Sequence, residues 1–530
     1  MRRWNGWGDT ERDFPLAPEA QAYLLAALGP GQALPDASLE QALALVPESR
    51  LPAHPGVDRS PETRLRHARG QSLPDWLAMR EGRLGPFPDG VAFPESSEAV
   101  RELLDWAMAH GVRVIPYGGG TSVVGHLSVP EGGAAVLSLS LEKLSRLLHL
   151  DPEARLARFG AGVAGPDLEA QLRPHGFRLG HYPQSFEYST LGGWIVTRSS
   201  GQQSLGFGRI EQLFAGGRME TPAGRLDIPT FPASGAGPDV REWALGSEGR
   251  FGVLTEAVVR VVPEPECERF EAFAFADWGA AVAAVRTLAQ ARIPLSMLRL
   301  SNAEETRVNL RLAGHARAVA WLERYLAWRG AGDGKCLLLI GISGTRAQVR
   351  AARRAALAVL RAGGAVGLGR TLGEKWKLGR YRAPYLRESL WRLGYAVDTL
   401  ETAADWPKVP ALVAGIETAL QQALADEGVA VRAFTHLSHF YAQGSSAYTT
   451  YVFPVGPDYA ATLARWRRLK AAASDAIVAG GGTISHQHGV GLDHKPWLVA
   501  EKGELGLSGI RALCGHFDPA GLMNPGKLVD

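Results

Sequence analysis

The chain has 530 residues, of which 46% are hydrophobic and 21% are charged; this is typical of soluble globular proteins, and the length predicts roughly two to four domains. Its 57 basic and 54 acidic side chains give a formal net charge of +3, so there is no reason to expect nucleic acid or another polyanion as a partner. Cys267, Cys336 and Cys514 form no CxxC pair and no apolar run could span a bilayer, so we expect a protein of the reducing cytoplasm.

Residues 1–89 are rich in proline, and we expect them to form a largely helical or irregular lead-in that packs on the rest of the chain. The first residues, MRRWNGWGDTERDF, contain basic side chains but no apolar stretch after them, so no signal peptide is expected. The last residues, NPGKLVD, do not form a peroxisomal tripeptide.

Residues 90–265 are expected to form the first folded domain, of α+β class. Apolar spacing between residues 91 and 115 predicts a strand, a helix that begins near Ser96 and ends at Gly111, and a second strand that leads into PYGGGTS. Short β-rich runs dominate the remainder of this domain: AAVLSLSL, RLARFGAGV and GVLTEAVVRVV.

Residues 266–480 alternate between strand and helix patterns, which favours a second, α/β domain with a split β-α-β sheet. The expected strands are FEAFAF, SMLRL and CLLLIGI, and helices are expected near residues 278–291 and 348–361. Residues 481–530 carry a histidine motif and are expected to return to the first domain.

A helix is expected in the segment RAVAWLERYLAWR, with arginines beside an apolar face formed by Ala318, Trp321, Leu322, Tyr325 and Trp328. Packing against the core is the favoured interpretation of this face. The alternative is that the face lies on a membrane and passes long-chain lipid to a site.

The motif PYGGGTS at residues 116–122 places three glycines directly after a strand. Because glycine has no Cβ, its backbone N–H groups can approach a ligand closely, and a phosphate is the natural ligand. No lysine follows as in a P-loop, and the spacing is not the GxGxxG of a dinucleotide fold. On this motif alone, a plain tight turn is the favoured interpretation.

Two further segments combine glycines, small residues and hydroxyl side chains: PQSFEYSTLGGWIVTRSSG at 183–201 and ALGSEGRFGVLTEAVVRV at 244–261. Three such segments can together enclose one long cofactor through main-chain contacts.

The motif GGGTISHQHGVG places His486 and His488 one residue apart. In an extended segment both imidazoles would face one side and Gln487 the other. A zinc site needs further ligands, and nothing in the sequence fixes His436 or His439 beside this pair, so we predict no metal. The alternative role is simple hydrogen bonding of the turn.

The sequence resembles the FAD-binding family of vanillyl-alcohol oxidase type and, within it, the alkyldihydroxyacetonephosphate synthases. The resemblance runs nearly from end to end and rests on WNGWG, IPYGGGTSV, STLGGWIVTRSSG, GSEGRFGVLTEA, LETAADW and SHQHGVG taken together. It implies a two-subdomain FAD-binding fold of vanillyl-alcohol oxidase type plus an α/β substrate (cap) domain.

The resemblance also implies which residues bind FAD. The glycine loop offers no cysteine or histidine for a covalent bond, so we expect non-covalent FAD. The implied cofactor residues are Pro116, Gly118, Gly119, Gly120, Thr121, Ser122, Pro183, Ser185, Ser189, Thr190, Gly193, Thr197, Arg198, Ser199, Glu248, Gly249, Gly252, Val253 and Leu254.

The activity that the resemblance implies belongs to ether-lipid synthesis. The acyl group of acyl-dihydroxyacetone phosphate is exchanged for a long-chain alcohol through a flavin N5 adduct, without net oxidation. Tyr448 matches the family's catalytic tyrosine, Arg387 the arginine near the substrate phosphate, and Arg299 another functionally important arginine. Without the resemblance, ion-pair roles for the arginines and a half-buried core position for the tyrosine would be favoured.

His486 and His488 match the first and third of three consecutive histidines in these synthases, and Gln487 replaces the middle one. Glutamine cannot titrate near neutral pH, so a proton-transfer role of the middle imidazole would be lost or the reaction would be a related one.

Two other functions are therefore considered. The first alternative is an FAD-linked oxidoreductase that oxidises a 2-hydroxy acid or an alcohol on the same fold. A non-enzymatic flavin or lipid carrier is disfavoured by Tyr448, Arg387 and His488. The expected partner is a lipid-like small-molecule substrate, and the sequence leaves open a peripheral membrane contact and a homodimer.

Overall fold

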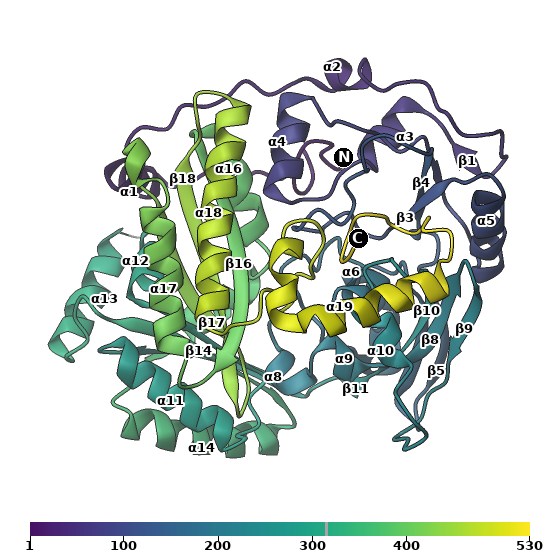
Figure 1. Ribbon diagram of the computed structural model, residues 1–530. Helices are drawn as coiled ribbons and strands as arrows, with labels where there is room; N and C mark the ends of the chain where they lie inside the picture. The colour runs from purple at the N-terminus through teal and green to yellow at the C-terminus, as the bar shows by residue number, and fades with distance from the viewer. Residues whose placement is uncertain (313–315) are drawn as a thin grey trace.

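The computed structural model describes residues 1–312 and 316–530 and shows two lobes that lie side by side (Figure 1). Two larger sheets build the first lobe, together with the small pair β7 (Phe177–Arg178) and β11 (Val262–Pro263). One seven-stranded sheet builds the second lobe. The mixture of separate antiparallel and parallel sheets agrees with the α+β class expected from the sequence.

The first sheet of the first lobe contains the glycine loop at one strand end. Its strand order is β1 (Val57–Asp58), β2 (Gly90–Ala92), β4 (Val136–Ser140), β3 (Arg113–Tyr117). The last three strands are parallel, and α5 (Ser97–Ala109) connects β2 to β3. Ser96 Oγ caps this helix by accepting a hydrogen bond from the Ala99 N–H at 3.1 Å. The strand, helix and strand expected between residues 91 and 115 are thus confirmed.

The second sheet is five-stranded and antiparallel, in the order β5 (Leu147–Asp151), β6 (Leu156–Gly160), β10 (Val253–Arg260), β8 (Phe214–Thr221), β9 (Gly224–Ile228). A core of buried apolar residues joins this sheet to α6 (Gly165–Leu172) and α7 (Leu191–Val196). Short helices fill the connections: α8 (Ser204–Phe207), α9 (Ile210–Leu213) and α10 (Arg241–Ala244).

The sheet of the second lobe has antiparallel pairing throughout. Its order is β15 (Val366–Gly369), β12 (Cys267–Phe275), β14 (Cys336–Gly344), β13 (Met297–Ser301), β17 (Arg432–Phe440), β18 (Gly444–Pro454), β16 (Tyr395–Asp405). Its helices are α11 (Trp278–Gln290), α12 (Ala303–Leu312), α13 (Ala316–Trp328), α14 (Arg346–Ala362), α15 (Thr371–Gly379), α16 (Leu386–Arg392), α17 (Val409–Gln422) and α18 (Tyr459–Ala479).

Alternation along the strands gives this sheet two different faces. Leu437 and Ala447 belong to the apolar core that also contains residues of α11 and α14. Their strand neighbours His436 and Tyr448 point to the opposite face, because successive side chains of a strand alternate. The sheet thus buries one face under helices and presents polar side chains on the other.

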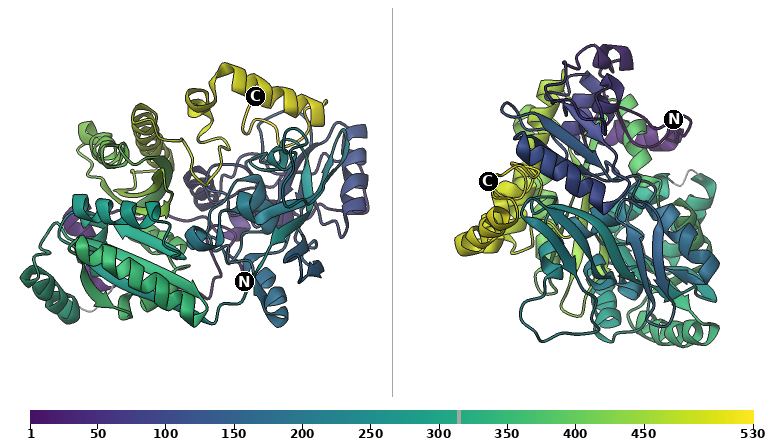
Figure 2. Two further views of the ribbon diagram at one scale, coloured as in Figure 1. Left: turned by 90° about the horizontal axis from the view of Figure 1, so that it is seen from below. Right: turned by 90° about the vertical axis from the view of Figure 1, so that its right-hand side faces the viewer.

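The two ends of the chain close the space between the lobes. The N-terminal region contains α1 (Pro18–Leu28), α2 (Leu39–Leu43), α3 (Pro61–Arg66) and α4 (Leu73–Glu81). The C-terminal helix α19 (Leu498–Phe517) lies on the outside of the first lobe (Figure 2). The chain then pairs with β3, where the Asn524 N–H donates to the Val114 carbonyl oxygen at 2.8 Å.

Helix α13 is only partly packed, although core packing of its apolar face is the favoured sequence interpretation. Leu326 is buried, and Leu322 and Tyr325 pack against the same small cluster. Trp321 and Trp328 are 68% and 79% exposed.

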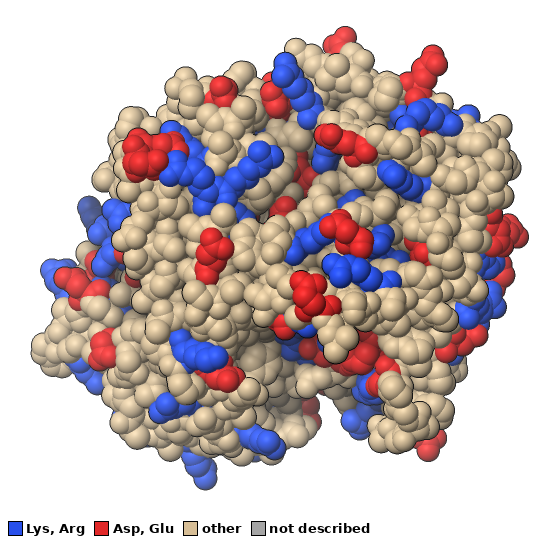
Figure 3. Space-filling model, viewed as in Figure 1, with Lys and Arg blue, Asp and Glu red and all other residues tan. Residues whose placement is uncertain are grey.

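Across residues 1–312 and 316–530, no helix has the length and hydropathy needed to cross a bilayer. Acidic and basic side chains are interspersed over the face shown in Figure 3. This distribution agrees with the near-neutral net charge.

Candidate active site

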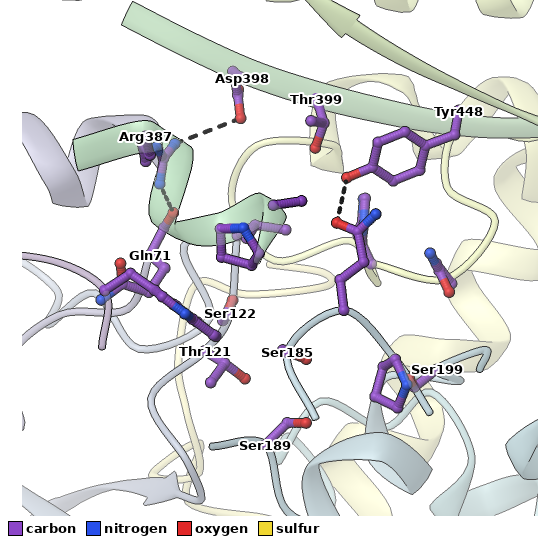
Figure 4. A pocket seen from close by; sticks show the side chains of 18 of the residues that line it. Gln71, Thr121, Ser122, Ser185, Ser189, Ser199, Arg387, Asp398, Thr399 and Tyr448 are labelled. Atoms are coloured by element: carbon purple, nitrogen blue, oxygen red, sulfur yellow. Dashed lines mark hydrogen bonds and ion pairs between the residues drawn. The ribbon is translucent and has the colours of Figure 1, made fainter. Parts of the chain in front are cut away.

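A cavity of about 450 Å³ lies between the two lobes and is lined by both. The three glycine-containing turns converge on it from the first lobe, although they are far apart in the sequence. Figure 4 shows small hydroxyl side chains of these turns, Thr121, Ser122, Ser185, Ser189 and Ser199, on one side of the cavity. Arg387 and Tyr448 face them from the other side.

The glycine loop and the second turn touch so closely that only glycine fits. A Cβ on Gly119 would lie 1.8 Å from the Tyr188 carbonyl oxygen, and one on Gly118 would lie 2.4 Å from Thr190 Oγ1. Gly120 has φ +69°, a backbone conformation that favours glycine. The loop conformation therefore depends on this triplet.

The N–H groups of residues 118–122 donate no hydrogen bond to any residue that the structure describes. Five consecutive free donors beside a cavity are unusual, because backbone donors away from solvent are nearly always paired. Free amides, glycines without Cβ atoms and flanking hydroxyl groups fit the diphosphate of FAD.

The third turn contains one residue with a strained backbone conformation. Glu248 has φ +52°, which is uncommon for a residue with a side chain and costs on the order of 1 kcal/mol. Its carboxylate accepts hydrogen bonds from the N–H groups of Val490 at 2.5 Å and Gly491 at 2.8 Å. Its carbonyl oxygen accepts one from Asn524 Nδ2 at 2.8 Å. Glu248 thus joins the cofactor turns to the C-terminal segment.

Seventeen of the nineteen implied cofactor residues line the cavity, and two do not. Val253 is a core residue of β10. Arg198 has φ +54° and directs its guanidinium to Glu242, away from the cavity. We propose that both act by shaping the turns.

Sequence reasoning missed His126, which reaches the cavity four residues after the glycine loop. Its Nε2 lies 2.9 Å from Glu248 Oε2, and its Nδ1 lies 2.7 Å from Ser122 Oγ. Ser122 Oγ also accepts hydrogen bonds from the N–H groups of Val124 at 3.4 Å and His126 at 3.3 Å. The hydroxyl of Ser122 is therefore engaged within its own turn, whereas its backbone N–H is free to meet a ligand.

The polar face of the second-lobe sheet supplies the titratable wall of the cavity. Strand pairing places His436 and Glu401 opposite Tyr448, one on each side. The rings of His436 and Tyr448 stack with their centroids 4.9 Å apart. The Tyr448 hydroxyl donates to Gln184 Oε1 at 3.4 Å. Burial raises the pKa of the Tyr448 phenol, so it keeps its proton at neutral pH.

Arg299 also lines the cavity, and its guanidinium is engaged by Glu305. Nη2 donates to Glu305 Oε1 at 2.8 Å and Nη1 donates to Ser301 Oγ at 3.1 Å. Arginine is suited to such double contacts because its donors form a rigid fork. The positive charge of Arg299 is therefore paired within the protein, and its role is to hold Glu305 and Ser301 in the cavity wall.

Arg387 lies in the cavity wall with much of its charge unmatched. Its guanidinium packs 5.0 Å from the Trp76 ring centroid and donates to the Gln71 carbonyl oxygen at 2.6 Å. Asp398 Oδ1 is 3.7 Å away. Burial lowers the pKa of Arg387. A buried cation with one loose carboxylate partner can bind a phosphate dianion.

The histidine motif does not have the orientation expected from its sequence. Gln487 and His488 line the cavity, whereas His486 lies behind the wall. The prediction that His486 and His488 face together is wrong because residues 486–488 form bends and not an extended strand. Gln487 Nε2 donates to Glu401 Oε2.

Behind the wall, His439 and Glu401 meet His486, with possible ligand atoms within 4.8 Å of one another. A bulge in β17 after Leu437 turns His439 toward this cluster. The Arg209 Nη1 group donates to His486 Nε2 at 2.5 Å, so Nδ1 of His486 carries the proton and faces Glu401 Oε1 at 3.2 Å. A protonated Nδ1 cannot ligate a metal, so we interpret the cluster as a hydrogen-bonded support.

An apolar extension of the cavity leaves the sheet face and runs between α1, α12 and α16 to the surface. Tyr23 of α1 donates to Glu304 of α12 at 2.7 Å and joins two of these walls. The apolar lining comprises Leu16, Ala20, Leu24, Val308, Leu312, Leu386, Leu390, Val397, Phe434 and Val452. The extension suits a hydrocarbon chain.

Comparison with known protein families divides the chain into two matched parts. The FAD binding domain matches residues 88–227, and the C-terminal domain of FAD linked oxidases matches residues 264–528. These matches confirm the expected fold class and FAD as the cofactor.

Two similar relatives are alkyldihydroxyacetonephosphate synthases. The protein of Dictyostelium discoideum is 32% identical over 473 residues, which cover 88% of this chain and 77% of the relative. That of Trypanosoma brucei brucei is 30% identical over 570 residues, which cover 99% and 92%. A solved alkyldihydroxyacetonephosphate synthase structure is 27% identical, has a TM-score of 0.85 and covers 99% of both chains.

Proposed function

The chain belongs to the alkyldihydroxyacetonephosphate synthase family, and we propose that it exchanges the acyl group of acyl-dihydroxyacetone phosphate for a long-chain alcohol, as in ether-lipid synthesis. The observation that carries this proposal is one cavity that combines free backbone donors, a buried arginine and an apolar extension. Each of these features meets one part of the required chemistry.

The first-lobe turns hold FAD, with the N–H groups of residues 118–122 directed to the diphosphate. When bound, FAD supplies the nucleophilic centre at which the exchange takes place. Non-covalent binding remains our prediction. It is supported by His126, the histidine beside the glycine loop, whose Nδ1 is hydrogen-bonded to Ser122 Oγ and whose Nε2 lies 2.9 Å from the Glu248 carboxylate.

Arg387 binds the substrate phosphate. Its planar fork suits a phosphate, and the pairing contributes roughly 1.5–3 kcal/mol when it excludes water. The stacking on Trp76 and the bond to Gln71 fix the guanidinium before the substrate arrives. The apolar extension then receives the acyl chain and, later, the alcohol.

Tyr448 acts as a proton donor. Because burial raises the pKa of its phenol, the hydroxyl is protonated at neutral pH and can donate to the departing carboxylate. His488 shares the cavity wall, and burial lowers its pKa, so it is a neutral hydrogen-bonding group there. His486 does not reach the cavity and acts by supporting Glu401, which holds Gln487.

The test is incubation of FAD-loaded protein with palmitoyl-dihydroxyacetone phosphate and labelled hexadecanol. We expect labelled alkyl product and an equal amount of palmitate. Absence of both products from protein with an intact flavin spectrum would reject the proposal.

A second function, oxidation of a 2-hydroxy acid or an alcohol, is favoured by the match to FAD linked oxidases and by Gln487. Anaerobic mixing with such substrates distinguishes the two functions. Bleaching of the flavin by a 2-hydroxy acid, without ether product, would establish the second function in place of the first.

We also propose that α13 contacts a lipid surface at the open end of the apolar extension. Trp321 and Trp328 are exposed, and Leu312, which lines the extension, is 37% exposed. Changing both tryptophans to Ser should reduce liposome flotation at least about tenfold, or about 1.4 kcal/mol. Phe231→Ser, at an exposed position of the first lobe, is the control. Equal flotation by wild type and the double variant would count against this contact.

A homodimer remains a prediction from the sequence. Light scattering tests it directly by measuring the molar mass of the protein in solution.

A further inference from the structure

His436 is a buried side chain of the cavity wall, and the reaction proposed above assigns it no role. It lies opposite Tyr448 across the β17–β18 pair and packs flat against its ring. Phe434 lies two residues earlier on the same face and begins the apolar extension. His436 therefore lies where a chain in the extension would present its polar end to the rest of the site.

A buried carboxylate fixes the orientation of this imidazole. Nδ1 of His436 lies 2.8 Å from Glu305 Oε1, and Glu305 is itself held by Arg299. Asn302 Oδ1 accepts a hydrogen bond from the Glu305 N–H at 2.9 Å and fixes the start of α12. Arg299 Nη2 also lies 3.1 Å from Nδ1, but it donates to Glu305 Oε1 at the shorter distance of 2.8 Å. A deprotonated Nδ1 would set its lone pair against the carboxylate at 2.8 Å, so the proton of the neutral ring is on Nδ1 and the lone pair is on Nε2.

The lone pair of Nε2 is available. No residue within 1–312 or 316–530 forms a hydrogen bond with this atom, although the ring lines the cavity. Burial lowers the pKa of His436, which keeps the ring neutral at pH 7. A neutral imidazole with an orienting carboxylate is the arrangement that general-base catalysis uses.

We infer that His436 is the general base of the exchange and takes the hydroxyl proton of the long-chain alcohol, with Glu305 as its positioning residue. This inference rests on the proposed function. The alcohol oxygen forms a bond to the carbon that the fatty carboxylate has left with its bonding electron pair. The hydroxyl proton passes to Nε2 of His436 and is then released to water. One ester and one alcohol thus give one ether, one carboxylate and one proton.

The other polar groups of the wall are less suited to this task. Gln487 cannot titrate, and its amide is engaged by Glu401. Tyr448 keeps its proton. His488 has no carboxylate hydrogen-bonded to its ring among the described residues, and its ring meets that of Tyr448 edge to face, with the centroids 6.0 Å apart. The chain therefore carries a titratable base at position 436, although position 487 holds glutamine.

His436→Asn tests the inference, because asparagine keeps a polar side chain but cannot serve as a base. We expect FAD content and the first stoichiometric release of palmitate, measured without alcohol, to stay within about threefold of wild type. Incorporation of labelled hexadecanol should fall by about 10²- to 10⁴-fold. His149→Asn, at an exposed position of β5 in the first lobe, is the control and should incorporate alcohol at nearly the wild-type rate.

The pH profile separates a base from a structural residue. The groups that face His436 are Arg299, Glu305, Tyr448 and Glu401; Arg299 lowers its pKa, whereas Glu305 and Glu401 raise it. Activity should fall on the acidic side as His436 is protonated. Glu305→Gln removes an influence that raises the pKa, so the acidic limb should move to lower pH while the plateau rate falls.

Three results would overturn the inference: full alcohol incorporation by His436→Asn, equal loss of palmitate release and alcohol incorporation in that variant, or an unchanged acidic limb in Glu305→Gln. A wild-type protein that releases no palmitate and forms no ether would instead reject the proposed function, and with it this inference.

Discussion

The two walls of the cavity are built on different principles. The first-lobe wall consists of turns whose glycines and free N–H groups meet the ligand through the backbone. The second-lobe wall is one face of a sheet that carries arginines, histidines, a tyrosine and carboxylates. The difference suggests a division of labour in which the first wall binds the cofactor and the second wall carries out proton transfer and substrate binding.

This division has a direct experimental meaning. A substitution in the first wall should change FAD affinity and spare the rate of FAD-saturated protein. A substitution in the second wall should change turnover or substrate binding at unchanged FAD content. A single substitution that changes both FAD affinity and the turnover of FAD-saturated protein would contradict this division between the two walls.

The largest effect is expected for Tyr448→Phe. The variant keeps the ring and its stacking on His436 but loses the hydroxyl that donates to Gln184. Turnover should fall by about 10²- to 10⁴-fold, the usual contribution of a general acid. FAD titration by fluorescence should give the wild-type affinity. Turnover within a factor of two of wild type would remove Tyr448 from the chemistry.

The next effect is expected for Gly119→Val, in the first wall. The new side chain would overlap the Tyr188 carbonyl oxygen and force the two turns apart. We expect the Kd for FAD to rise about 10- to 100-fold, on the scale of overpacking costs of roughly 1–3 kcal/mol, while turnover at saturating FAD stays near wild type. Gly235→Val is the control, since a Cβ there meets nothing within 4 Å. An unchanged Kd would contradict the role given to the glycine loop.

A smaller effect is expected for Arg387→Lys. Lysine keeps the positive charge but not the fork, so the contact to phosphate becomes a single point charge. The KM for acyl-dihydroxyacetone phosphate should rise about tenfold, or about 1.4 kcal/mol, with little change in kcat. The informative comparison is a substrate analogue without phosphate, whose KM should be the same for both proteins. If Arg387→Lys raises the KM of both substrates by the same factor, Arg387 does not bind the phosphate.

The smallest effect concerns acid stability. Burial lowers the pKa values of His436, His439 and His486, so the folded state holds these rings neutral. As the pH falls below their unfolded value of about 6.5, the unfolded state gains protons that the folded state does not, and stability decreases.

Between pH 7.5 and 5.5, amide exchange corrected for its intrinsic pH dependence should therefore rise at least about threefold in β17 and β18. The reference strands are β6 and β10, which contain no histidine. An equal rise of the amide exchange rate in both pairs of strands would show that the second wall is not specifically sensitive to acid.

Much of the fold follows from local sequence patterns. The strand, helix and strand before the glycine loop were predictable because their apolar periodicity and the Ser96 cap are local signals. The convergence of the three glycine turns was suggested by their shared composition and implied by the family resemblance, since no local pattern brings residues 118, 190 and 249 together. The boundaries at residues 89, 265 and 480 remain predictions.

The parts of the site that could not be predicted depend on tertiary placement. His126 and Glu305 lie outside every recognised motif, and they meet their partners only because separate elements pack together. The orientation of Gln487 was predicted wrongly because the rule for extended strands was applied to a series of bends. His439 reaches Glu401 through a bulge that strand periodicity does not reveal.

The most direct measurement is a crystal structure of the FAD-loaded protein. We expect the diphosphate to lie against the N–H groups of residues 118–122, with the isoalloxazine ring facing Tyr448. FAD bound elsewhere, or a diphosphate that makes no contact with these backbone groups, would contradict the separation of the two walls.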